Sequence, residues 1–396
     1  NTKIKFLISQ VDLNDPADIW TIDGSLNTLS DRPGMDSQKT NSYGMKVFHS
    51  FDGFELQSYT SSTDTNVIFS YDADWGNTDS HFPYVYDYFS ETLRNRKSFN
   101  QEFRAVSNSA DFQKNSFFEW VIGANYLELK ESNLKKDDGL YGDPSDPYGP
   151  YASASSSSSK YKSSNFSVFG NLDYLLSASL KFSIGLRWED WESDYSDSLQ
   201  ESFNPTDKMS GGKISLIKNM TNDTNMYASL AKGYKQGGFN LGLGLDANAT
   251  NKNLAYDPEF LTNYELGINT KFLDSRITFN GVLFYSDRED QKVLISTQTD
   301  PSDPNTFSFL TQNAAEGVNH GLEINMDMEI NESLSAFVNL GILKTEIKNW
   351  QSRQDLEGRA QAHAPERSYA LGLNWAPTSH TYLAIDFTGK SRFYYS

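Results

Sequence analysis

Residues 227–240 read Tyr-Ala-Ser-Leu-Ala-Lys-Gly-Tyr-Lys-Gln-Gly-Gly-Phe-Asn, a short alternating run that ends in paired glycines between aromatic and amide side chains. This pattern is typical of a β-strand that leaves a hydrophobic band. A tight polar turn at 220–225 precedes the strand, and a stretch rich in Gly, Asn, Asp and Ala follows it as far as Thr262. A short connection at one end and a long one at the other, repeated along a chain, predict a membrane β-barrel with short turns at one rim and long loops at the other.

The composition favours one large β-structure over several soluble domains, although the 396 residues would allow either. Aromatic residues make up 14% of the chain, yet the total hydrophobic content is only 37%. A soluble protein of this size needs a larger apolar fraction for its core. A barrel with a wet, polar lumen does not, because only alternate residues of each strand face lipid.

Several classes of protein are excluded by the same numbers. No run approaches the roughly 18 consecutive apolar residues of a membrane helix. The formal charge of −18 argues against nucleic acid as a partner, because binding to phosphates requires clustered Lys and Arg. The absence of cysteine excludes a disulfide framework and a thiolate metal site. The chain opens inside a strand-like run with no signal peptide, so we expect its start to be internal to a longer protein.

The clearest predicted hairpin spans 165–175 and 179–188, where apolar and polar side chains alternate. The same period of two recurs in the later strand-like runs, and aromatic residues such as Trp188, Tyr285 and Trp375 stand near the ends of the runs, as in interfacial girdles. A soluble β-sandwich would alternate as well, so the period alone leaves both folds open. One face of the hairpin carries Phe166, Val168, Gly170, Leu172, Tyr174, Leu180, Phe182, Ile184, Leu186 and Trp188, and the other face of its second strand carries Lys181, Ser183, Gly185, Arg187 and Glu189.

The lengths of the connections favour the barrel. Short and long connections alternate, which suits up-and-down strands of about ten residues that cross an apolar band of about 25 Å, whereas a Greek-key sandwich has no reason to keep every other loop short. The turn Phe51-Asp52-Gly53 predicts a further hairpin. Short connections lie around Ser177, Thr221, Asp274, Asn331 and Thr378, and long ones lie around Asp197, Asp246, Asp303 and Leu356.

The predicted fold class is therefore all-β, a transmembrane antiparallel up-and-down β-barrel in which 1–396 forms one partial barrel domain. The low-complexity tract between Lys135 and Lys162 carries too little apolar surface to order itself, and we expect it to be an outer loop. Long outer loops are predicted near 11–39, 74–97, 134–162, 193–207, 237–261, 298–306 and 349–365.

Gly-Tyr-Lys-x-Gly-Gly-Phe-Asn at 233–240, Tyr-Glu-Leu-Gly at 264–267, Asn-Ala-Ala-Glu-Gly at 313–317 and Ala-Pro-Glu-Arg at 364–367 follow one another along the chain. In order and spacing they resemble motifs of TonB-dependent outer-membrane receptors, the active transporters of iron–siderophore complexes and related scarce nutrients. The resemblance implies a protein of the Gram-negative outer membrane that needs no cofactor. It also implies three partners: outer-membrane lipid, a small-molecule iron chelate or other nutrient, and the TonB complex.

The resemblance further implies an amino-terminal plug domain, which contacts the TonB complex and is not in this sequence. The last strands of the family, with their terminal aromatic residue, are not in it either. We expect the chain to supply about fifteen of roughly 22 strands. An open sheet of this kind would leave two unpaired edges in lipid, so we expect the chain to be a part of its protein.

Motifs for enzymatic or metal chemistry are absent from the sequence. It has no Gly-x-Ser-x-Gly elbow, phosphate loop or nucleotide fingerprint, so we expect no enzyme. A calcium site in the acidic loop stays an alternative, although its carboxylates lack the spacing of an EF-hand and a solvated loop is the better interpretation. The carboxylates of the acidic loop are Asp137, Asp138, Asp143 and Asp146. The histidines lie too far apart in sequence for a metal-binding pair. They are His49, His81, His320, His363 and His380.

The strand that carries the Gly-Tyr-Lys-x-Gly-Gly-Phe-Asn motif is called the signature strand below. The outer rim after this strand is the predicted substrate site. Aromatic rings there offer stacking area to a catechol or heterocyclic chelator, and an arginine offers a charge-assisted bond to its anionic oxygens. Gly237 and Gly238 are expected to permit a bend with positive φ. The predicted substrate contacts are Tyr234, Gln236, Phe239, Asn240, Trp350 and Arg367.

The predicted function is energy-coupled import of a ferric siderophore or similar scarce chelate across the outer membrane. The residues themselves support a large barrel with long outer loops, and the coupling and the siderophore are implied by the resemblance alone. A carbohydrate or vitamin importer of the same fold and a passive porin are the alternatives. A barrel hydrolase, whose Ser, His and Asp need not be adjacent in sequence, is a more distant one.

Overall fold

The computed structural model describes residues 1–17, 19–21, 24–108, 117–240, 255–298, 307–350 and 353–395, and its regular structure is almost entirely β-strand. A short 3₁₀ helix, η2 (Gln354–Leu356), follows one of the strands. Within these described ranges, no helix is both long and apolar enough to cross a membrane. The chain divides into two compact units.

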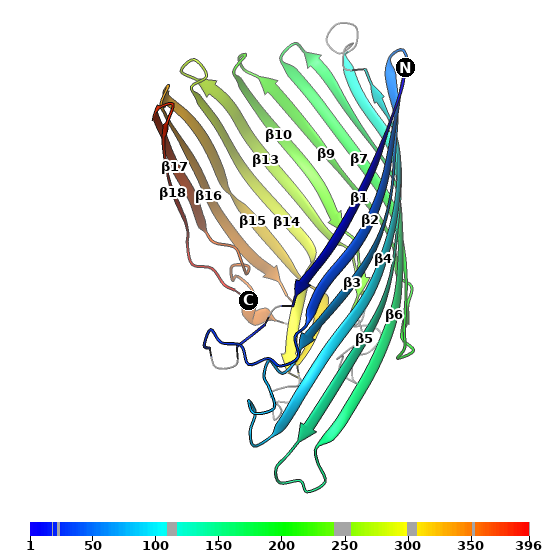
Figure 1. The fold of residues 1–396 in the computed structure, drawn as a ribbon. Coiled ribbons are helices and arrows are strands. Elements are labelled where there is room, and N and C mark those ends of the chain that lie inside the picture. The colour runs from blue at the N-terminus through cyan, green and yellow to red at the C-terminus, as the bar shows by residue number, and fades with distance from the viewer. Residues whose placement is uncertain are drawn as a thin grey trace. The chain divides into compact units, whose positions relative to one another are not determined.

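The first unit comprises Asn1–Ala105, Gly123–Ser167 and Asp190–Thr206. Its strands pair with their sequence neighbours, and the antiparallel β1–β2 and β2–β3 ladders run without a register shift (Figure 1). The predicted turn after Ser50 is confirmed: the Phe51 N–H donates to the Phe54 carbonyl (2.9 Å), and Gly53 has a φ of +91°, which glycine adopts at little steric cost. The strands that begin in or contribute to this unit are β1 (Thr2–Pro16), β2 (Met35–Ser50), β3 (Phe54–Asp72), β4 (Val85–Ser107), β5 (Phe118–Gly142), β6 (Tyr151–Ser177), β7 (Leu180–Asp197) and β8 (Ser202–Phe203).

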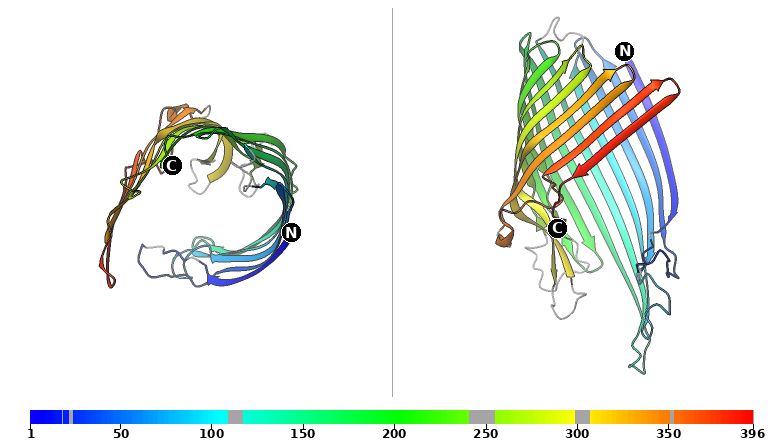
Figure 2. Two further views of the ribbon diagram at one scale, coloured as in Figure 1. Left: turned by 90° about the horizontal axis from the view of Figure 1, so that it is seen from above. Right: turned by 90° about the vertical axis from the view of Figure 1, so that its left-hand side faces the viewer.

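The second unit comprises Val106–Ile122, Val168–Glu189 and Asp207–Ser396, and so includes the other ends of β5, β6 and β7. Figure 2 shows β13–β18, yellow to red, side by side with their short turns at one end. A separate two-stranded sheet pairs β11 (Gly238–Phe239) with β12 (Ala255–Tyr256). The remaining strands are β9 (Thr206–Asn219), β10 (Thr224–Lys235), β13 (Glu259–Phe272), β14 (Ile277–Gln298), β15 (Phe307–Asn331), β16 (Leu334–Asn349), β17 (Arg367–Thr378) and β18 (Thr381–Lys390).

Alternate side chains of the second unit lie on two chemically different faces of its sheet. On the polar face, Glu265 accepts hydrogen bonds from Asn263 (2.7 Å) and Ser229 (3.4 Å). On the apolar face, Leu266 and Leu283 oppose each other in register and are 49% and 54% exposed. Contiguous exposed apolar surface of this extent suits lipid rather than water. The apolar face includes Leu172, Leu186, Trp188, Ile214, Leu216, Leu230, Tyr264, Leu266, Leu283, Tyr285, Leu340, Ile342, Tyr369, Leu371, Leu373, Trp375, Leu383, Ile385 and Phe387.

The predicted all-β class with antiparallel up-and-down order is confirmed. Among the described residues, fifteen strands pair edge to edge in sequence order, namely β1–β7, β9, β10 and β13–β18. The predicted short connections are confirmed as the turns after β6, β9, β13, β15 and β17. The long connections predicted around Asp246 and Asp303 lie outside the described residues, as does almost all of the predicted loop 298–306.

The predicted loop boundaries were wrong where strands extend beyond their apolar segments. β5 continues to Gly142 and β6 begins at Tyr151, so most of the low-complexity tract predicted to be unordered is strand. β1 and β2 likewise shorten the predicted loop 11–39. The physical reason is that ladder hydrogen bonds join backbone groups, which serine provides as well as any residue, so an antiparallel pair can continue without burying apolar side chains.

A charge on the apolar face should destabilise the protein according to its depth. We expect Leu266→Arg to lower the free energy of unfolding from a bilayer by about 2–4 kcal/mol, because the arginine would enter the hydrocarbon band. The control is Leu273→Arg in the turn after β13, where Leu273 is 58% exposed, and its expected cost is about 0–1 kcal/mol. Denaturant titration in lipid vesicles measures both values, and equal costs would contradict the assignment of the apolar face to lipid.

Candidate functional site

Tyr234, the last residue but one of the signature strand β10, takes part in a closed set of three polar contacts within the second unit. Its hydroxyl donates to Oε2 of Glu189 (3.1 Å) and accepts from Nε of Arg187 (3.2 Å), and Arg187 in turn donates from Nε to Glu189 Oε2 (2.8 Å). β10 pairs with β9 only as far as Lys232, opposite Gly212. Beyond that point the Tyr234 ring lies against Gly211, where a Cβ atom would stand 3.1 Å from the ring. The ring is thus held at both its edge and its hydroxyl.

A hollow of about 800 Å³ surrounds this set of contacts. Four of the five charged residues that line it are basic, although the whole chain has a net charge of −18. Register places Lys235 opposite Glu259 and Lys213 opposite Ala231, both on the polar face, whereas Lys232 follows Leu230 on the apolar face. The hollow is lined by Arg187, Glu189, Lys213, Lys232, Tyr234, Lys235 and Gln236, together with Gly170, Gly185, Gly211, Gly212 and Gly233.

The paired glycines after β10 are needed for close approach. A Cβ atom on Gly237 would lie 2.5 Å from Asp207 Oδ2, which accepts a hydrogen bond from the Gly237 N–H (3.1 Å). A Cβ atom on Gly238 would lie 2.6 Å from the Tyr256 hydroxyl oxygen. The predicted positive φ at these two positions is wrong, because neither glycine has a left-handed backbone. Gln236 is fixed beside them, since its carbonyl accepts a hydrogen bond from Lys292 Nζ.

Phe239 and Asn240 continue the segment into β11 and onto β15. Phe239 is partly buried and pairs in register with Ala255 of β12. Asn240 is only 8% exposed, and its side-chain amide pairs with the backbone of Thr311: Nδ2 donates to the Thr311 carbonyl (2.8 Å), and Oδ1 accepts from the Thr311 N–H (2.7 Å). Asn240 therefore acts as a strand partner for β15.

Trp350 and Arg367, the other two predicted contacts, lie in different surroundings. Trp350 is 7% exposed and packs in a hydrophobic cluster with Ala315, Ile347 and Leu356, which fastens the loop after β16. Arg367 begins β17 opposite Ile342 on the apolar face, and it is exposed. Of the six predicted residues, Tyr234 and Gln236 line the hollow.

Sequence reasoning missed Arg187, Glu189 and Lys213, which complete the hollow. Arg187 and Glu189 are 47 and 45 residues before Tyr234, so no local motif connects them. A signal was nevertheless present, because both belong to the polar side of the predicted hairpin and stand at its long-loop end. Charged residues on that side that align by register with the signature strand could have been selected as candidate site residues.

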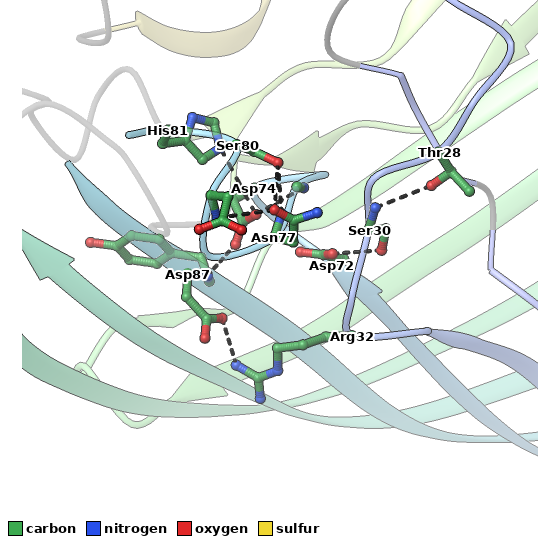
Figure 3. Close-up of polar contacts among 12 residues, drawn as sticks. Thr28, Ser30, Arg32, Asp72, Asp74, Asn77, Ser80, His81 and Asp87 are labelled. Carbon is green, nitrogen blue, oxygen red and sulfur yellow. Dashed lines mark hydrogen bonds and ion pairs between the residues drawn. The ribbon is translucent and has the colours of Figure 1, made fainter. Parts of the chain in front are cut away.

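A loop in the first unit is held by several polar contacts. Figure 3 shows the loop between β3 and β4, where Asp74 lies beside Asn77 and His81. Asp74 is 6% exposed, and its carboxylate accepts hydrogen bonds from the N–H groups of Gly76 (2.9 Å) and Tyr88 (2.5 Å). The preceding loop is fastened to the same place, since Ser30 donates to Asp72 (2.5 Å) and Arg32 pairs with Asp87 (3.2 Å).

The acidic loop that was considered for calcium uses its carboxylates locally. Asp143 accepts hydrogen bonds from the N–H and hydroxyl of Ser145, and Asp146 accepts one from the Tyr151 hydroxyl (2.9 Å). Asp137 accepts one from Ser90 (2.7 Å). In the part of the chain that the structure describes, no group of three or more His, Cys, Asp or Glu residues has the arrangement of a metal site.

Removing the Tyr234 hydroxyl should lower the stability of the protein while the aromatic ring stays in its place. We expect Tyr234→Phe to lower the free energy of unfolding by about 1.5–3 kcal/mol, because two hydrogen bonds to charged groups are lost while the ring stays on Gly211. Tyr264→Phe, on the apolar face, is the matched control with an expected change within about 0.5 kcal/mol. Denaturant unfolding of the two variants in parallel measures the difference, and similar small effects would show that the three polar contacts do not stabilise the fold.

Asp74 should make the stability of its loop depend on pH. Burial raises the pKa of the Asp74 carboxyl above its ordinary 3.8, although the N–H groups of Tyr88 and Gly76 lower it. Because the folded pKa exceeds the unfolded one, ionised Asp74 costs stability above the folded pKa, and this cost disappears as the pH falls through that value. We expect wild type to gain stability relative to Asp74→Asn as the pH is lowered from neutral toward 3.8.

Proteolysis of the loop across this pH range measures the effect. The asparagine side chain also leaves one backbone N–H without its acceptor, which costs about 1–3 kcal/mol. This cost is the same at every pH, so it can be distinguished from the effect of Asp74 ionisation. The matched control is Asp79→Asn, an exposed residue of the same loop. A difference between wild type and Asp74→Asn that stays constant with pH would contradict the expectation.

Comparison with known proteins agrees with this fold. Residues 6–396 match the model of the TonB dependent receptor-like β-barrel family. Among solved structures, the ferric yersiniabactin uptake receptor FyuA from Yersinia pestis is 18% identical with a TM-score of 0.64, and the match covers 92% of this chain and 52% of the receptor. The siderophore receptor PiuA from Acinetobacter baumannii is 15% identical with a TM-score of 0.71, covering 98% of this chain and 62% of the receptor.

The copper transporter OprC is similar as well, at 12% identity and a TM-score of 0.66, over 95% of this chain and 54% of the transporter. At these identities the likeness to each structure shows the fold alone. The chain spans between half and two thirds of the length of each of these three proteins. The match to the family model covers nearly every residue, and the chain belongs to the TonB-dependent receptor-like β-barrel family.

Proposed function

We propose that this chain is the barrel part of an energy-coupled importer in the outer membrane of a Gram-negative bacterium, and that its substrate is a ferric siderophore or similar anionic chelate. The proposal assigns no enzymatic activity to the chain. The observation that carries the choice of substrate is the basic hollow at the end of the signature strand, in a chain that is otherwise strongly acidic.

Charge supports an anionic substrate at this place. Arg187 is neutralised by Glu189, but Lys213 and Lys235 form no ion pair among the described residues, so their ammonium groups are available to a ligand. The acidic remainder of the chain opposes an anion at long range. Screening over about 8 Å at physiological ionic strength limits that repulsion, and the charges within the hollow then decide the affinity.

Placement supports contact with a solute. The hollow lies at the long-loop end of β10, as predicted for the outer rim of the barrel, and Tyr234 presents a ring whose position is fixed by three neighbours. A ring that is already ordered loses little conformational entropy when a ligand stacks on it. We assign substrate contact to Tyr234, Gln236 and Phe239, and a supporting role to Asn240 and Trp350, which are buried against neighbouring strands.

The alternatives differ from this proposal in measurable ways. A carbohydrate or vitamin importer would share the fold but would not depend on the lysines of the hollow, because a neutral ligand gains little from them. OprC is described as a copper transporter, so a similar fold also serves a different cargo. A passive porin would admit solutes without an energy source.

Uptake of radioactive ferric siderophore by cells that lack the chromosomal gene and carry the complete protein on a plasmid tests the proposal. We expect Tyr234→Ala combined with Phe239→Ala to raise the apparent KM about tenfold or more, because stacking contacts worth about 0.5–1.5 kcal/mol each are lost together with the Tyr234 hydroxyl. We expect a protonophore to abolish uptake by wild type.

The control is Tyr264→Ala, which removes an aromatic side chain from the apolar face, where Tyr264 is 49% exposed. Surface expression is equalised before rates are compared. Uptake that persists with the protonophore would identify a porin, and growth that is indifferent to iron supply would remove the siderophore from the proposal. Unchanged KM in the double variant at equal expression would reduce Tyr234 and Phe239 to structural residues of the rim.

A further inference from the structure

A groove in the second unit lies on its apolar face. It has a volume of about 1120 Å³ and extends over β5, β6, β7, β9 and β10. Its sides are the exposed side chains of Ile122, Leu186 and Ile214, which are 57%, 63% and 45% exposed. Gly170 and Gly212 lie between larger residues on this face, and their backbone forms the floor of the groove because they have no side chains. Small residues at such positions let another molecule approach the backbone closely.

One end of the groove reaches the level of the aromatic girdle. Trp188 lies eight residues from the short turn on β7, and Tyr264 and Tyr285 lie eight residues from the short turns of β13 and β14. With a rise of about 3.4 Å per residue and a tilt of about 40°, this places the three rings about 20 Å above the turns, near the edge of an apolar band of about 25 Å. This is the depth at which lipid headgroups begin.

Lys232 stands at this same level, eight residues from the start of β10 at Thr224. Its Nζ lies 4.9 Å from the centre of the Phe260 ring, which holds the ammonium group toward the headgroup side of the groove. Lys232 is opposite Thr262 of β13, and Thr262 is opposite Asp287 of β14, so this carboxylate on the same face is two strands away from Lys232. Lys232 forms no ion pair among the described residues. A lysine in this position extends its apolar stem along the groove and its charge into the interface.

We propose that this groove binds an acyl chain of a phosphate-bearing membrane lipid and that Lys232 pairs with the phosphate of its headgroup. Charge complementarity favours this occupant, because the groove is apolar along its length and carries its outward-facing cation at headgroup depth. A second copy of the chain would have to place a carboxylate against Lys232 within the membrane. The inference rests on the membrane placement in the proposed function. Lys232 also lines the hollow, but the substrate is assigned to the ammonium groups of Lys213 and Lys235, which lie on the polar face.

The complete protein, extracted from membranes and exchanged into detergent with equal amounts of two probe lipids, is analysed by native mass spectrometry. The probes are bisphosphorylated lipid A and the same glycolipid with its phosphates removed, so that their acyl chains are identical. We expect wild type to retain the phosphorylated form about fivefold better, since one lysine near a membrane surface contributes about 1 kcal/mol toward an anionic lipid. Lys232→Ala should abolish this preference.

Two further variants make the result specific. Lys213→Ala removes a lysine one register step away on the polar face, and it should leave the preference unchanged. Gly170→Leu should lower retention of both probes by filling the groove. Its Cβ would meet the Val121 carbonyl oxygen at 3.3 Å, so the variant is compared only after its folded yield has been checked against wild type.

A preference that survives in Lys232→Ala, or that is lost equally in Lys213→Ala, overturns the proposal. Lipid-free dimers in which Gly170→Leu blocks association would instead identify the groove as an interface between copies. Failure of the protein to insert into bilayers would refute the membrane placement and this inference together. Normal lipid preference with no chelate uptake would refute the proposed substrate alone.

Discussion

The pairing of backbone N–H and C=O groups between neighbouring strands is the constraint on which this structure depends. Without water, an unpaired backbone group costs several kcal/mol, so a strand that crosses lipid must be bonded along its length. The β13–β14 ladder meets this demand from Phe260 opposite Glu289 to Phe272 opposite Ile277 with no register shift. Once the ladder is fixed, side chains have only two directions available, and the period of two in the sequence follows from it.

Where the ladder stops, side chains take over its hydrogen bonds. The amide of Asn240 donates to and accepts from the backbone of Thr311, as a residue of a neighbouring strand would. Asp207 accepts from the Gly237 N–H, and Asp74 does the same for the N–H groups of Gly76 and Tyr88. These polar residues near the long loops thus stabilise the fold, although sequence motifs alone would assign them to a ligand.

The parts of the fold that could be predicted from sequence are those governed by this local period. Alternation and connection length were enough for the strand order and for the turn at Gly53. The strand ends could not be predicted, because the serine-rich start of β6 carries no alternation and is held by backbone bonds that any sequence can make. The partners of Tyr234 were hidden for a different reason, since Arg187 and Glu189 reach it only through the register of other strands.

Gly211 and Gly212 show how one strand can serve two environments. The Tyr234 ring packs on Gly211, whereas a Cβ atom on Gly212 would meet Leu186 Cδ2 at 2.9 Å on the apolar face. Successive residues of a strand point in opposite directions, and both glycines line the polar hollow as well as the apolar groove. A side chain added at either position would therefore change both of them. The absence of two neighbouring side chains in β9 thus shapes both the hollow at the end of β10 and the groove on the apolar face.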